Sequence, residues 1–595
     1  MNPIAKRSSR RRTMVASGFV LLVLGGFVLR LVDIQVVHAA EHVEDAGSKM
    51  TTAETLWGNR GSIVDEHGVV LASSTMTYDV NIDPTLAKDL KITDADGTKH
   101  VRTWDEQASA IAEVLGMTPD SIKKIVADKQ ATEPESQWAQ LTRGVTTAQY
   151  QALRNLEIPA LDYDAVPARA YPNGAVAGNL IGFESSDGEA LAGIERWQND
   201  CLESKNGSVK YQFGADSGVR IPGSEKLTPA QDGGKVQLTI DSDLQWYMEQ
   251  MIAEETQNQK AVTGTVTVVD VKTGAIRAAA QYPAMDPNDV LATDPAHRGS
   301  AVFGTTFEPG STFKAITAAS LLEEGVANPM TTVTAGDFER FANGAALGDS
   351  HSHPVQTYTL AGALIDSSNV ALSHLGELLP DEKRWEWLKK FGITGGPVVG
   401  FPGEENGFMR PPSEWDPQTH YTTTFGQGFT ATVPQVVSAY QTIANDGVRV
   451  PLSLVESCTA PDGTVTTPEK RDSERVISEK TAADMQLMLE NVAFQSSVAD
   501  QIRVPGYSIA AKTGTAQKTD SNGGYKAGVY FTSIVGFAPA EDPQYVVMIT
   551  LDEPKRVTSS AATAPALQKA MTHVLQSYRI VPGRSEPETV LPMLK

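Results

Sequence analysis

Cysteine is scarce in this chain of 595 residues, which contains only Cys201 and Cys458. Two cysteines so far apart in sequence make neither a disulfide framework nor a metal site. A single bridge between them is possible in an exported protein, but the sequence favours two separate cysteines. The phosphate-binding pattern G-x-x-x-x-G-K-[ST] and the dinucleotide pattern G-x-G-x-x-G are also missing. We therefore expect no cofactor and no metal.

Basic charge is scarce beyond the first residues. The chain holds 50 basic and 72 acidic residues, for a formal net charge of −22. Before residue 14 the balance is reversed, because this stretch contains no acid and five basic residues: Lys6, Arg7, Arg10, Arg11 and Arg12. An acidic body disfavours nucleic acid as a partner. The composition, 41% hydrophobic and 21% charged, is otherwise that of a globular protein, and the length predicts two or three domains.

One long apolar run follows the basic cluster. Residues 14–29 carry no charge, and the apolar character continues to residue 37. About 20 such residues suffice for one transmembrane helix. Acids follow the run at Glu41, Glu44 and Asp45. The positive-inside rule then predicts that residues 1–13 are cytoplasmic and that the body lies outside the membrane.

The alternative to this anchor at 14–37 is a cleaved signal peptide. Val37-His38-Ala39 resembles a cleavage site with small residues. The apolar run is long for a signal peptide, however, and Arg30 and Asp33 interrupt its end, so a retained anchor is favoured. These two charges could pair along one helix face and meet a partner helix, although an exposed, solvated helix end is the preferred interpretation.

Two regions follow the anchor. Residues 38–235 mix short β-like runs with turns, such as a strand, turn and strand over 59–72 with Gly68 in the turn, and a helical pattern over 104–129.

Residues 236–580 form the second region. They begin with a strand, which is followed by a helix over 242–259. Strand patterns occur near both ends of the region, and helical patterns lie between them in the sequence. We expect an α+β protein in which an antiparallel sheet is packed by helices, with a loosely held tail over 581–595.

Three short motifs occur in order within the second region. Ser311-Thr312-Phe313-Lys314 follows Glu308-Pro309-Gly310, Ser367-Ser368-Asn369 comes next, and Lys512-Thr513-Gly514-Thr515 comes last. S-x-x-K, S-x-N and K-T-G in this order are expected of a penicillin-recognising acyl-transfer enzyme.

The residue types fit that chemistry. Pro309-Gly310 predicts a helix start at Ser311, with Lys314 one turn further on the same face. To act as a base near neutral pH, the lysine needs its pKa lowered by about three units, or roughly 4 kcal/mol. Burial and a second cation, Lys512, would both lower it. Ser367 can pass protons, and Asn369 can hold Lys314 and a substrate amide.

The K-T-G-T strand offers groups to a substrate. The hydroxyl groups of Thr513 and Thr515 can bind a carboxylate, and Gly514 allows a close backbone approach.

Each motif by itself is short enough to occur by chance. Ser121-Ile122-Lys123-Lys124, Ser204-Lys205-Asn206 and Lys272-Thr273-Gly274 repeat the three patterns in contexts typical of a surface helix, a polar turn and a hairpin turn. Only the ordered set with its glycine-led start favours catalysis.

Asp349, His351 and His353 could suggest a metal site, but a polar loop beside the active site is favoured.

With these motifs the chain resembles the class B penicillin-binding proteins, which are membrane-anchored D,D-transpeptidases of cell-wall synthesis. The resemblance includes a non-catalytic pedestal with motifs at Arg60-Gly61, Arg169-Ala170-Tyr171-Pro172 and Gly193-Ile194-Glu195, although Glu66-His67 replace the usual Arg-Asn. Phe425-Gly426-Gln427-Gly428 also matches the family's transpeptidase domain. The ending Gly536-Phe537-Ala538-Pro539-Ala540 looks more like the septal than the elongation branch.

The resemblance implies roles for the motif residues. Ser311 would be the nucleophile and Lys314 the base, with Ser367, Asn369 and Lys512 completing the proton network. Thr513 and Thr515 would bind the D-alanine carboxylate, and the N–H groups of Ser311 and Thr515 would form the oxyanion hole. Implied partners are peptidoglycan stem peptides, the lipid-linked precursor, β-lactams and a polytopic SEDS-type glycan polymerase with other division proteins.

Other functions are less favoured. A D,D-carboxypeptidase or β-lactamase needs neither the anchor nor the pedestal. A penicillin sensor needs a transducing domain, and 13 residues cannot fold as one. A scaffold without activity would be expected to have lost a motif, and all three are intact. An elongation-specific transpeptidase remains the alternative within the family.

Overall fold

The computed structural model describes residues 3–38, 51–93, 99–185, 187–213, 219–469, 471–519 and 524–595. Two compact units are present. The first comprises Met1–Asn59 and Ser204–Asp232, and the second comprises Arg60–Glu203 and Gly233–Lys595. The second unit therefore contains the three catalytic motifs and most of the pedestal.

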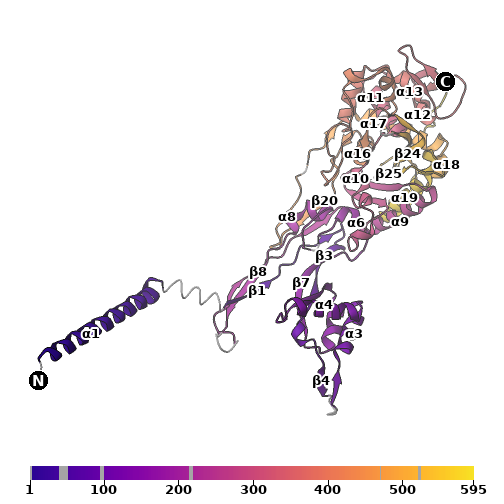
Figure 1. Cartoon of the computed structure of the whole chain (residues 1–595). Helices are drawn as coiled ribbons and strands as arrows, with labels where there is room; N and C mark the ends of the chain where they lie inside the picture. The colour runs from indigo at the N-terminus through magenta and orange to yellow at the C-terminus, as the bar shows by residue number, and fades with distance from the viewer. Residues whose placement is uncertain are drawn as a thin grey trace. The chain divides into compact units, whose positions relative to one another are not determined.

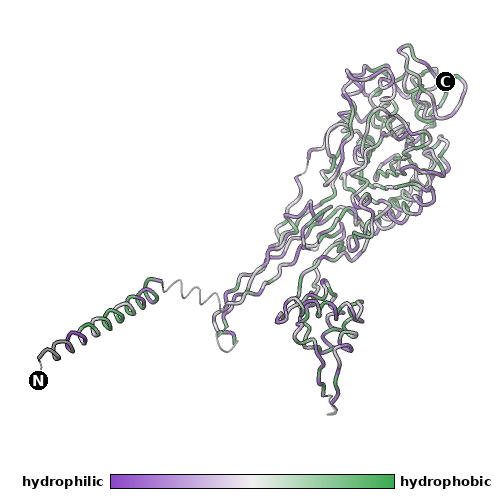
Figure 2. Tube along the Cα trace, in the orientation of Figure 1, coloured by the Kyte–Doolittle hydropathy of each residue, from purple (hydrophilic) through white to green (hydrophobic). Residues whose placement is uncertain are grey.

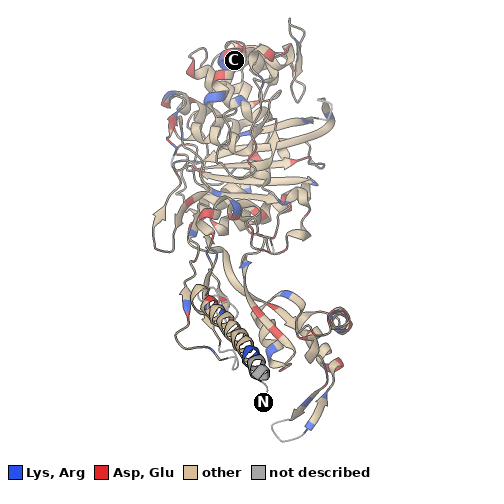
Figure 3. Cartoon of the chain, turned by 60° about the vertical axis from the view of Figure 1, so that its left-hand side comes forward, with Lys and Arg blue, Asp and Glu red and all other residues tan. Residues whose placement is uncertain are grey.

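The first unit begins with the expected apolar helix. Helix α1 spans Pro3–Val32 and continues as a π-helical turn over Asp33–Val37. The stretch Arg10–Val37 is long and apolar enough to cross a membrane, and Figure 2 shows its apolar run in green. Basic residues gather at the N-terminal end of the helix (Figure 3). Arg30 Nη1 lies 2.5 Å from Asp33 Oδ2, so the two charges pair as expected.

The same unit holds an antiparallel sheet in the order β1-β8-β9. Its strands are β1 (Thr51–Leu56), β8 (Gly207–Gln212) and β9 (Lys226–Thr228). Strand β1 pairs along its whole length with β8, from Thr51 opposite Gln212 to Leu56 opposite Gly207. Segments about 150 residues apart in sequence thus form one ribbon.

In the second unit the pedestal is built on a seven-stranded sheet of order β21-β20-β10-β2-β3-β6, with β7 also paired to β3. Its strands are β2 (Ile63–Val64), β3 (Val70–Ile82), β6 (Ala139–Val145), β7 (Leu161–Ala170), β10 (Lys235–Leu238), β20 (Val455–Thr459) and β21 (Val465–Thr466). The turn between β2 and β3 is the expected one, with Gly68 at φ 86°. β20 and β21 come from beyond residue 236, so the sheet crosses the boundary that we expect at 235.

Helices α3 (Trp104–Leu115), α4 (Pro119–Thr132) and α5 (Thr147–Asn155) pack together, and α4 and α5 contact β6 and β3. The other elements of the pedestal are a hairpin of β4 (Leu90–Thr93) and β5 (Lys99–Arg102) and the short helices α6 (Gly178–Ile181), α7 (Gly193–Trp197) and α8 (Asn199–Leu202), the last of which contacts β10. The single helical pattern predicted over 104–129 is thus two helices. Gly116, at φ 68°, ends α3, and Thr118 caps α4.

The pedestal motifs meet in a buried ionic cluster. Arg60 Nε donates to Glu195 Oε2 at 2.8 Å, and Arg169 Nε donates to Glu195 Oε1 at 2.6 Å. Glu184 also pairs with Arg60, at 2.6 Å. Glu195 is fully buried, so removing either arginine would leave one oxygen of a buried carboxylate without its charged partner.

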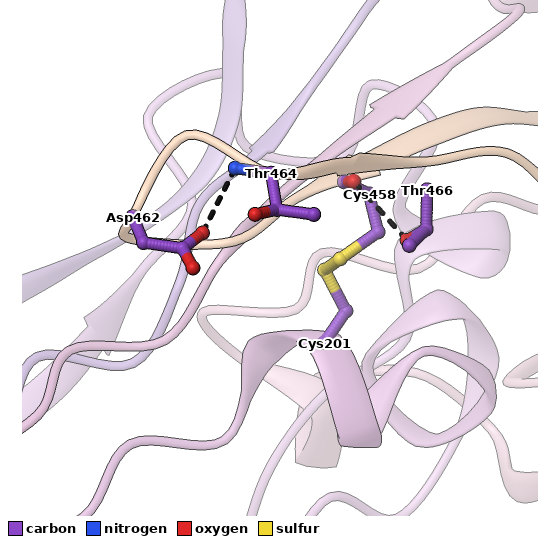
Figure 4. The surroundings of a disulfide bond; sticks show 5 residues. All are labelled: Cys201, Cys458, Asp462, Thr464 and Thr466. Atoms are coloured by element: carbon purple, nitrogen blue, oxygen red, sulfur yellow. Dashed lines mark hydrogen bonds between the residues drawn. A yellow bond between two sulfur atoms is a disulfide. The ribbon is translucent and has the colours of Figure 1, made fainter.

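The two cysteines form a disulfide, contrary to the favoured sequence interpretation. Cys201 at the end of α8 joins Cys458 on β20 (Figure 4). The two cysteines are far apart in sequence, but the fold brings them together. Strand β20 pairs with β10 in the pedestal sheet, and Gly234, the residue before β10, donates its N–H to the Cys201 carbonyl at 2.7 Å.

The catalytic region contains the expected antiparallel sheet, in the order β12-β11-β25-β24-β23. The strands are β11 (Thr263–Asp270), β12 (Ile276–Tyr282), β23 (Ala510–Thr519), β24 (Tyr525–Ala538) and β25 (Tyr545–Asp552). Helices α9 (Ser242–Gln259) and α19 (Ala564–Ser577) pack on one face, and α16 (Val433–Ala444) with α17 (Glu479–Gln495) packs on the other (Figure 1).

Alternation along the strands divides the core between these faces. On β25, Val547 and Ile549 belong to the core under α9 and α19, whereas Val546 and Met548 face the larger core on the opposite side. Both faces of the strand are apolar because helices cover both. This explains why the strands read as continuous apolar runs.

Besides α16 and α17, further helices come between β12 and β23 in the sequence. They are α10 (Ala301–Gly304), α11 (Lys314–Glu323), α12 (Leu360–Ile365), α13 (Asn369–Gly376), α14 (Asp381–Lys390), α15 (Pro417–Thr422) and α18 (Ala499–Ile502). The same region contains short two-stranded sheets: β13 (Thr306–Phe307) with β18 (Ala431–Thr432), β14 (Thr332–Ala335) with β17 (Gln356–Thr359), β15 (Phe338–Arg340) with β16 (Ala346–Gly348), and β19 (Val448–Arg449) with β22 (Glu474–Arg475).

The tail over 581–595 is not loosely held, which corrects the sequence prediction. Leu591 is buried in the larger core, and its N–H donates to Asn491 Oδ1 on α17 at 2.8 Å. Thr359, which caps α12, donates its N–H to the Met593 carbonyl at 3.1 Å. The prolines of the tail predicted loose attachment, but they do not reveal such anchors to distant residues.

Candidate active site

Ser311 lies in a tight turn that leads directly into a helix. The turn Gly310–Phe313 is 3-10 helical, and α11 continues from Lys314. The sequence predicts a helix start at Ser311, and the regular helix begins three residues later. Ser311 is half-buried, whereas Thr312 and Phe313 are buried. The nucleophile expected from the motif therefore reaches solvent from an otherwise enclosed turn.

Two glycines let strand β23 approach this turn. Gly310 has φ 56°, and a Cβ there would lie 2.9 Å from the Thr515 carbonyl oxygen. A Cβ on Gly514 would lie 2.9 Å from the Thr312 methyl and 3.0 Å from the Pro309 carbonyl oxygen. The expected close approach at Gly514 is thus made by the protein's own turn, which fixes Ser311 against the K-T-G-T strand.

The hydroxyl of Ser367 lies between two buried lysines. Lys314 Nζ lies 3.2 Å and Lys512 Nζ 3.0 Å from Ser367 Oγ, and Lys314 Nζ also donates to the Ser367 carbonyl. Ser367 has φ 59°, a left-handed conformation that costs a non-glycine residue roughly 1–3 kcal/mol. The fold thus brings together residues from all three motifs, although the first and the last lie about 200 residues apart in sequence.

Burial determines the protonation of both lysines. Lys314 is 0% exposed and Lys512 is 1% exposed. Burial, followed by the neighbouring charge of Lys512, places the pKa of Lys314 well below its usual range. Burial lowers the pKa of Lys512 to about 7. Both directions are those that a lysine base requires.

Asn369 is placed differently from the prediction. Its side-chain Nδ2 donates to the Gly348 carbonyl at 2.9 Å, and no hydrogen bond joins it to Lys314 within the described residues. Asn369 is the first residue of α13, and from this position its side chain reaches the backbone of Gly348.

Thr513 and Thr515 are both half-buried residues of β23, the edge strand of the five-stranded sheet. Spacing by two places them on the same face of the strand. Thr515 Oγ1 accepts the N–H of Ser560 at 3.0 Å, which leaves its hydroxyl proton free to be donated. An edge strand with free hydroxyl donors suits an extended peptide that ends in a carboxylate.

Glu308 was missed as a site residue. Its carboxylate accepts the N–H of Gly428 at 2.9 Å and the Tyr525 hydroxyl at 3.0 Å, so it joins three segments around the Ser311 turn. The signal was its place just before Pro309-Gly310, which we used only as a helix-start pattern.

The Asp349, His351 and His353 loop lies beside the S-x-N motif, as the favoured interpretation has it. Asp349 Oδ1 accepts the N–H of Asn369 at 2.5 Å, and His351 pairs with Asp366 at 3.3 Å. In the described part of the chain, the side chains close enough to share a metal ion are instead Glu66, His67 and Asp241. Glu66 is already paired with Arg277.

Two family models match the chain. The penicillin binding protein transpeptidase domain matches residues 264–572, and the penicillin-binding protein dimerisation domain matches residues 55–238. PbpB, a penicillin-binding protein of Mycolicibacterium smegmatis, is 33% identical over 94% of this chain and 89% of its own length. The peptidoglycan D,D-transpeptidase FtsI of Escherichia coli is 26% identical over 96% and 92%.

Among solved structures, penicillin-binding protein 3 of Mycobacterium tuberculosis in complex with aztreonam is similar, with a TM-score of 0.68. It is 25% identical, and the match covers 91% of this chain and all of that one. The chain therefore belongs to the penicillin-binding proteins with a transpeptidase domain, and the class B assignment made from the motifs is confirmed. It is a transpeptidase enzyme of this family.

Proposed function

We propose that this protein is a peptidoglycan D,D-transpeptidase that works through an acyl-enzyme on Ser311. The observation that carries the proposal is the Ser367 hydroxyl between Lys314 and Lys512, next to the Ser311 turn. The similarity to a relative named as a peptidoglycan D,D-transpeptidase and to a protein solved with aztreonam supports the substrate class and β-lactam binding.

In the first half-reaction the Ser311 oxygen attacks the carbonyl of the penultimate D-alanine of a stem peptide. A neutral Lys314 has two N–H groups, which its contacts with the Ser367 carbonyl and hydroxyl occupy, so its lone pair is left to take the Ser311 proton. As the C–N bond breaks, that proton passes through Ser367 to the departing amine, and free D-alanine leaves. Thr513 and Thr515 hold its carboxylate.

In the second half-reaction an amine from a neighbouring stem attacks the ester. The new amide forms the cross-link, the Ser311–acyl bond breaks, and the amine proton returns to Ser311 through the lysines. The N–H groups of Ser311 and Thr515 stabilise the oxyanion in both steps. A β-lactam would acylate the same serine and remain attached, because its ring opens without losing a leaving group.

The acyl-enzyme is tested with the full-length protein, a fluorescent penicillin and intact-mass analysis. Ser311→Ala should abolish the adduct. Ser121→Ala, in the S-x-x-K copy on α4, is the matched control because Ser121 is also half-buried, and it should label as the wild type does. An adduct that persists in Ser311→Ala would refute the nucleophile.

Turnover separates the transpeptidase from the alternatives. With a D-Ala-D-Ala stem peptide and an acceptor amine, we expect D-alanine release together with the cross-linked product. Hydrolysis without cross-linking would indicate a carboxypeptidase, and stable acylation without turnover would indicate a sensor or scaffold.

We further propose a septal role, with the amino-terminal residues in the cytoplasm and the body outside. The anchor would keep the enzyme near nascent strands and next to a polytopic glycan polymerase of the SEDS type. The resemblance of Gly536-Phe537-Ala538-Pro539-Ala540 to the septal branch and the similarity to relatives named PbpB and FtsI support this branch over the elongation branch. The Arg30–Asp33 pair is the candidate for recognising a partner's membrane helices.

The anchor proposal is tested by replacing residues 14–37 with an unrelated apolar helix. Penicillin labelling should persist while septal wall synthesis fails. If the variant with the replaced helix fully supports division, the segment is only a passive tether, and the proposed role of Arg30 and Asp33 is wrong.

A further inference from the structure

The S-x-N segment is held from two sides. On one side it follows α12, where the Ser367 N–H donates to the Leu364 carbonyl at 3.2 Å. On the other side it begins α13, whose first two N–H groups, those of Asn369 and Val370, donate to Asp349 Oδ1 at 2.5 and 3.0 Å. Because Ser367 is in a strained left-handed conformation, such contacts help to keep its hydroxyl between the two lysines.

The second carboxylate oxygen of Asp349 is held by a histidine. His353 Nε2 lies 2.9 Å from Asp349 Oδ2, and the Asp349 side chain is completely buried while that of His353 is 7% exposed. The other ring nitrogen, Nδ1, lies 2.9 Å from the Pro354 carbonyl oxygen. Asp349 thus links His353 directly to the start of the helix that carries Asn369.

This geometry requires a charged imidazole. A carbonyl oxygen only accepts hydrogen bonds, so Nδ1 must carry a proton, and an ionised carboxylate only accepts, so Nε2 must carry one too. The other oxygen of Asp349 already accepts the N–H groups of Asn369 and Val370, so His353 is the third donor to this carboxylate. Neutral His353 would therefore turn one bare nitrogen toward an oxygen lone pair.

The charges around His353 agree with this state. Asp349, Asp366 and Asp337 are its acidic neighbours, the last of which accepts the His353 backbone N–H. The Tyr358 hydroxyl on β17 lies 3.4 Å from Nε2 and donates to Asp366 at 2.5 Å, and His351 lies beside the ring. Burial by itself would lower the pKa of His353, but the hydrogen bonds to Asp349 and Pro354 and the charges of Asp349 and Asp366 together raise it.

We propose that protonated His353 is a positioning residue for the transpeptidase reaction. It fixes Asp349 on the N–H groups of Asn369 and Val370 and so holds Ser367 between Lys314 and Lys512. When His353 loses its proton, Asp349 loses its second support, the start of α13 loosens and the acylation of Ser311 slows. The inference rests on the proposed acyl-enzyme. It adds that the acylation rate falls at alkaline pH because His353 loses its proton.

The test measures the second-order rate constant for acylation of the full-length protein by a fluorescent penicillin across a range of pH. For the wild type we expect a fall on the alkaline side. His353→Gln keeps a donor close to the Nε2 position but cannot titrate, so this fall should disappear. His353→Phe provides no donor, and its rate should be on the order of tenfold lower at neutral pH with the thermal unfolding transition retained.

His351→Gln is the matched control on the same loop, since His351 is half exposed and pairs with Asp366 rather than Asp349. It should keep the alkaline fall. A wild-type rate without that fall, or a fall that persists in His353→Gln, would overturn the proposal. Failure of the acyl-enzyme itself gives a different result, because the wild type would then form no adduct at Ser311 at any pH.

Discussion

At the scale of single residues, the two buried lysines beside Ser367 should determine how acylation depends on pH. The pKa of Lys512 is about 7, and Lys314 lies against the same hydroxyl. Below about pH 7 the pair already carries one proton, so accepting the Ser311 proton would place two charges side by side. We expect the acylation rate constant to fall about tenfold per pH unit in this range.

The measurement is the rate of penicillin labelling of the wild type from about pH 5 upward. Thermal unfolding at each pH serves as the control for acid denaturation. A rate that stays constant down to the lowest pH would contradict a lysine base with a lowered pKa.

A second residue-scale prediction concerns Glu249 on α9, which is buried away from the catalytic residues. It accepts the N–H of Ala177 at 2.9 Å, and burial raises its pKa to about 7. Between about pH 4.5 and 7 the folded protein therefore holds a proton that the unfolded chain has released. Stability should decline by roughly 3 kcal/mol as pH rises through this window.

Glu249→Gln removes that proton equilibrium and keeps an acceptor for Ala177. Its thermal unfolding temperature should exceed that of the wild type by a margin that grows with pH up to about 7. Glu254→Gln, at an exposed position of the same helix, should show no such trend. Parallel pH curves for Glu249→Gln and the wild type would rule out the assignment.

At the scale of elements, the tail over 581–595 should stabilise the helices that carry the site. Asn491 on α17 is completely buried and holds the tail through Leu591 N–H and the Thr589 carbonyl. Asn491→Ala would leave these groups without partners and should cost about 2 kcal/mol. Because the tail also contacts the cap of α12, the acylation of Ser311 should slow several-fold.

Lys480→Ala on the exposed face of α17 is the control and should change the free energy of unfolding by less than about 0.5 kcal/mol. Thermal unfolding and penicillin labelling of both variants provide the measurements. Normal stability in Asn491→Ala would mean that the tail is only loosely attached after all.

At the scale of the whole molecule, the disulfide links two regions that are far apart in sequence. Cys201 and Cys458 are separated by 257 residues, and the bridge ties the pedestal helix α8 to β20. Serine at both positions should lower stability by roughly 2–4 kcal/mol, because the unfolded chain loses a long-range constraint. Acylation at room temperature should not change, since neither cysteine contacts a motif residue.

Thermal unfolding with and without reductant checks this prediction. Reductant should lower the unfolding temperature of the wild type to that of the double variant and leave the double variant unchanged. An equal effect of reductant on both proteins would show that the bridge contributes nothing.

Local patterns in the sequence determined much of this protein. Helix α9 spans the predicted residues 242–259, and the hairpin of β11 and β12 turns at Gly274 as expected, because caps, glycine and strand alternation act over a few residues. The three motifs were identified for the same reason, since each one is short and their order is visible along the chain. The family followed from them.

Only the tertiary structure decided the contacts between distant segments. The disulfide, the anchoring of the tail and the hydrogen bond of Asn369 to Gly348 each depend on how segments that are not neighbours in sequence pack. No periodicity encodes such pairs, because burial and distance arise only when the chain is folded. Burial likewise decides the charge of Lys314 and Lys512, which the sequence could express only as a requirement.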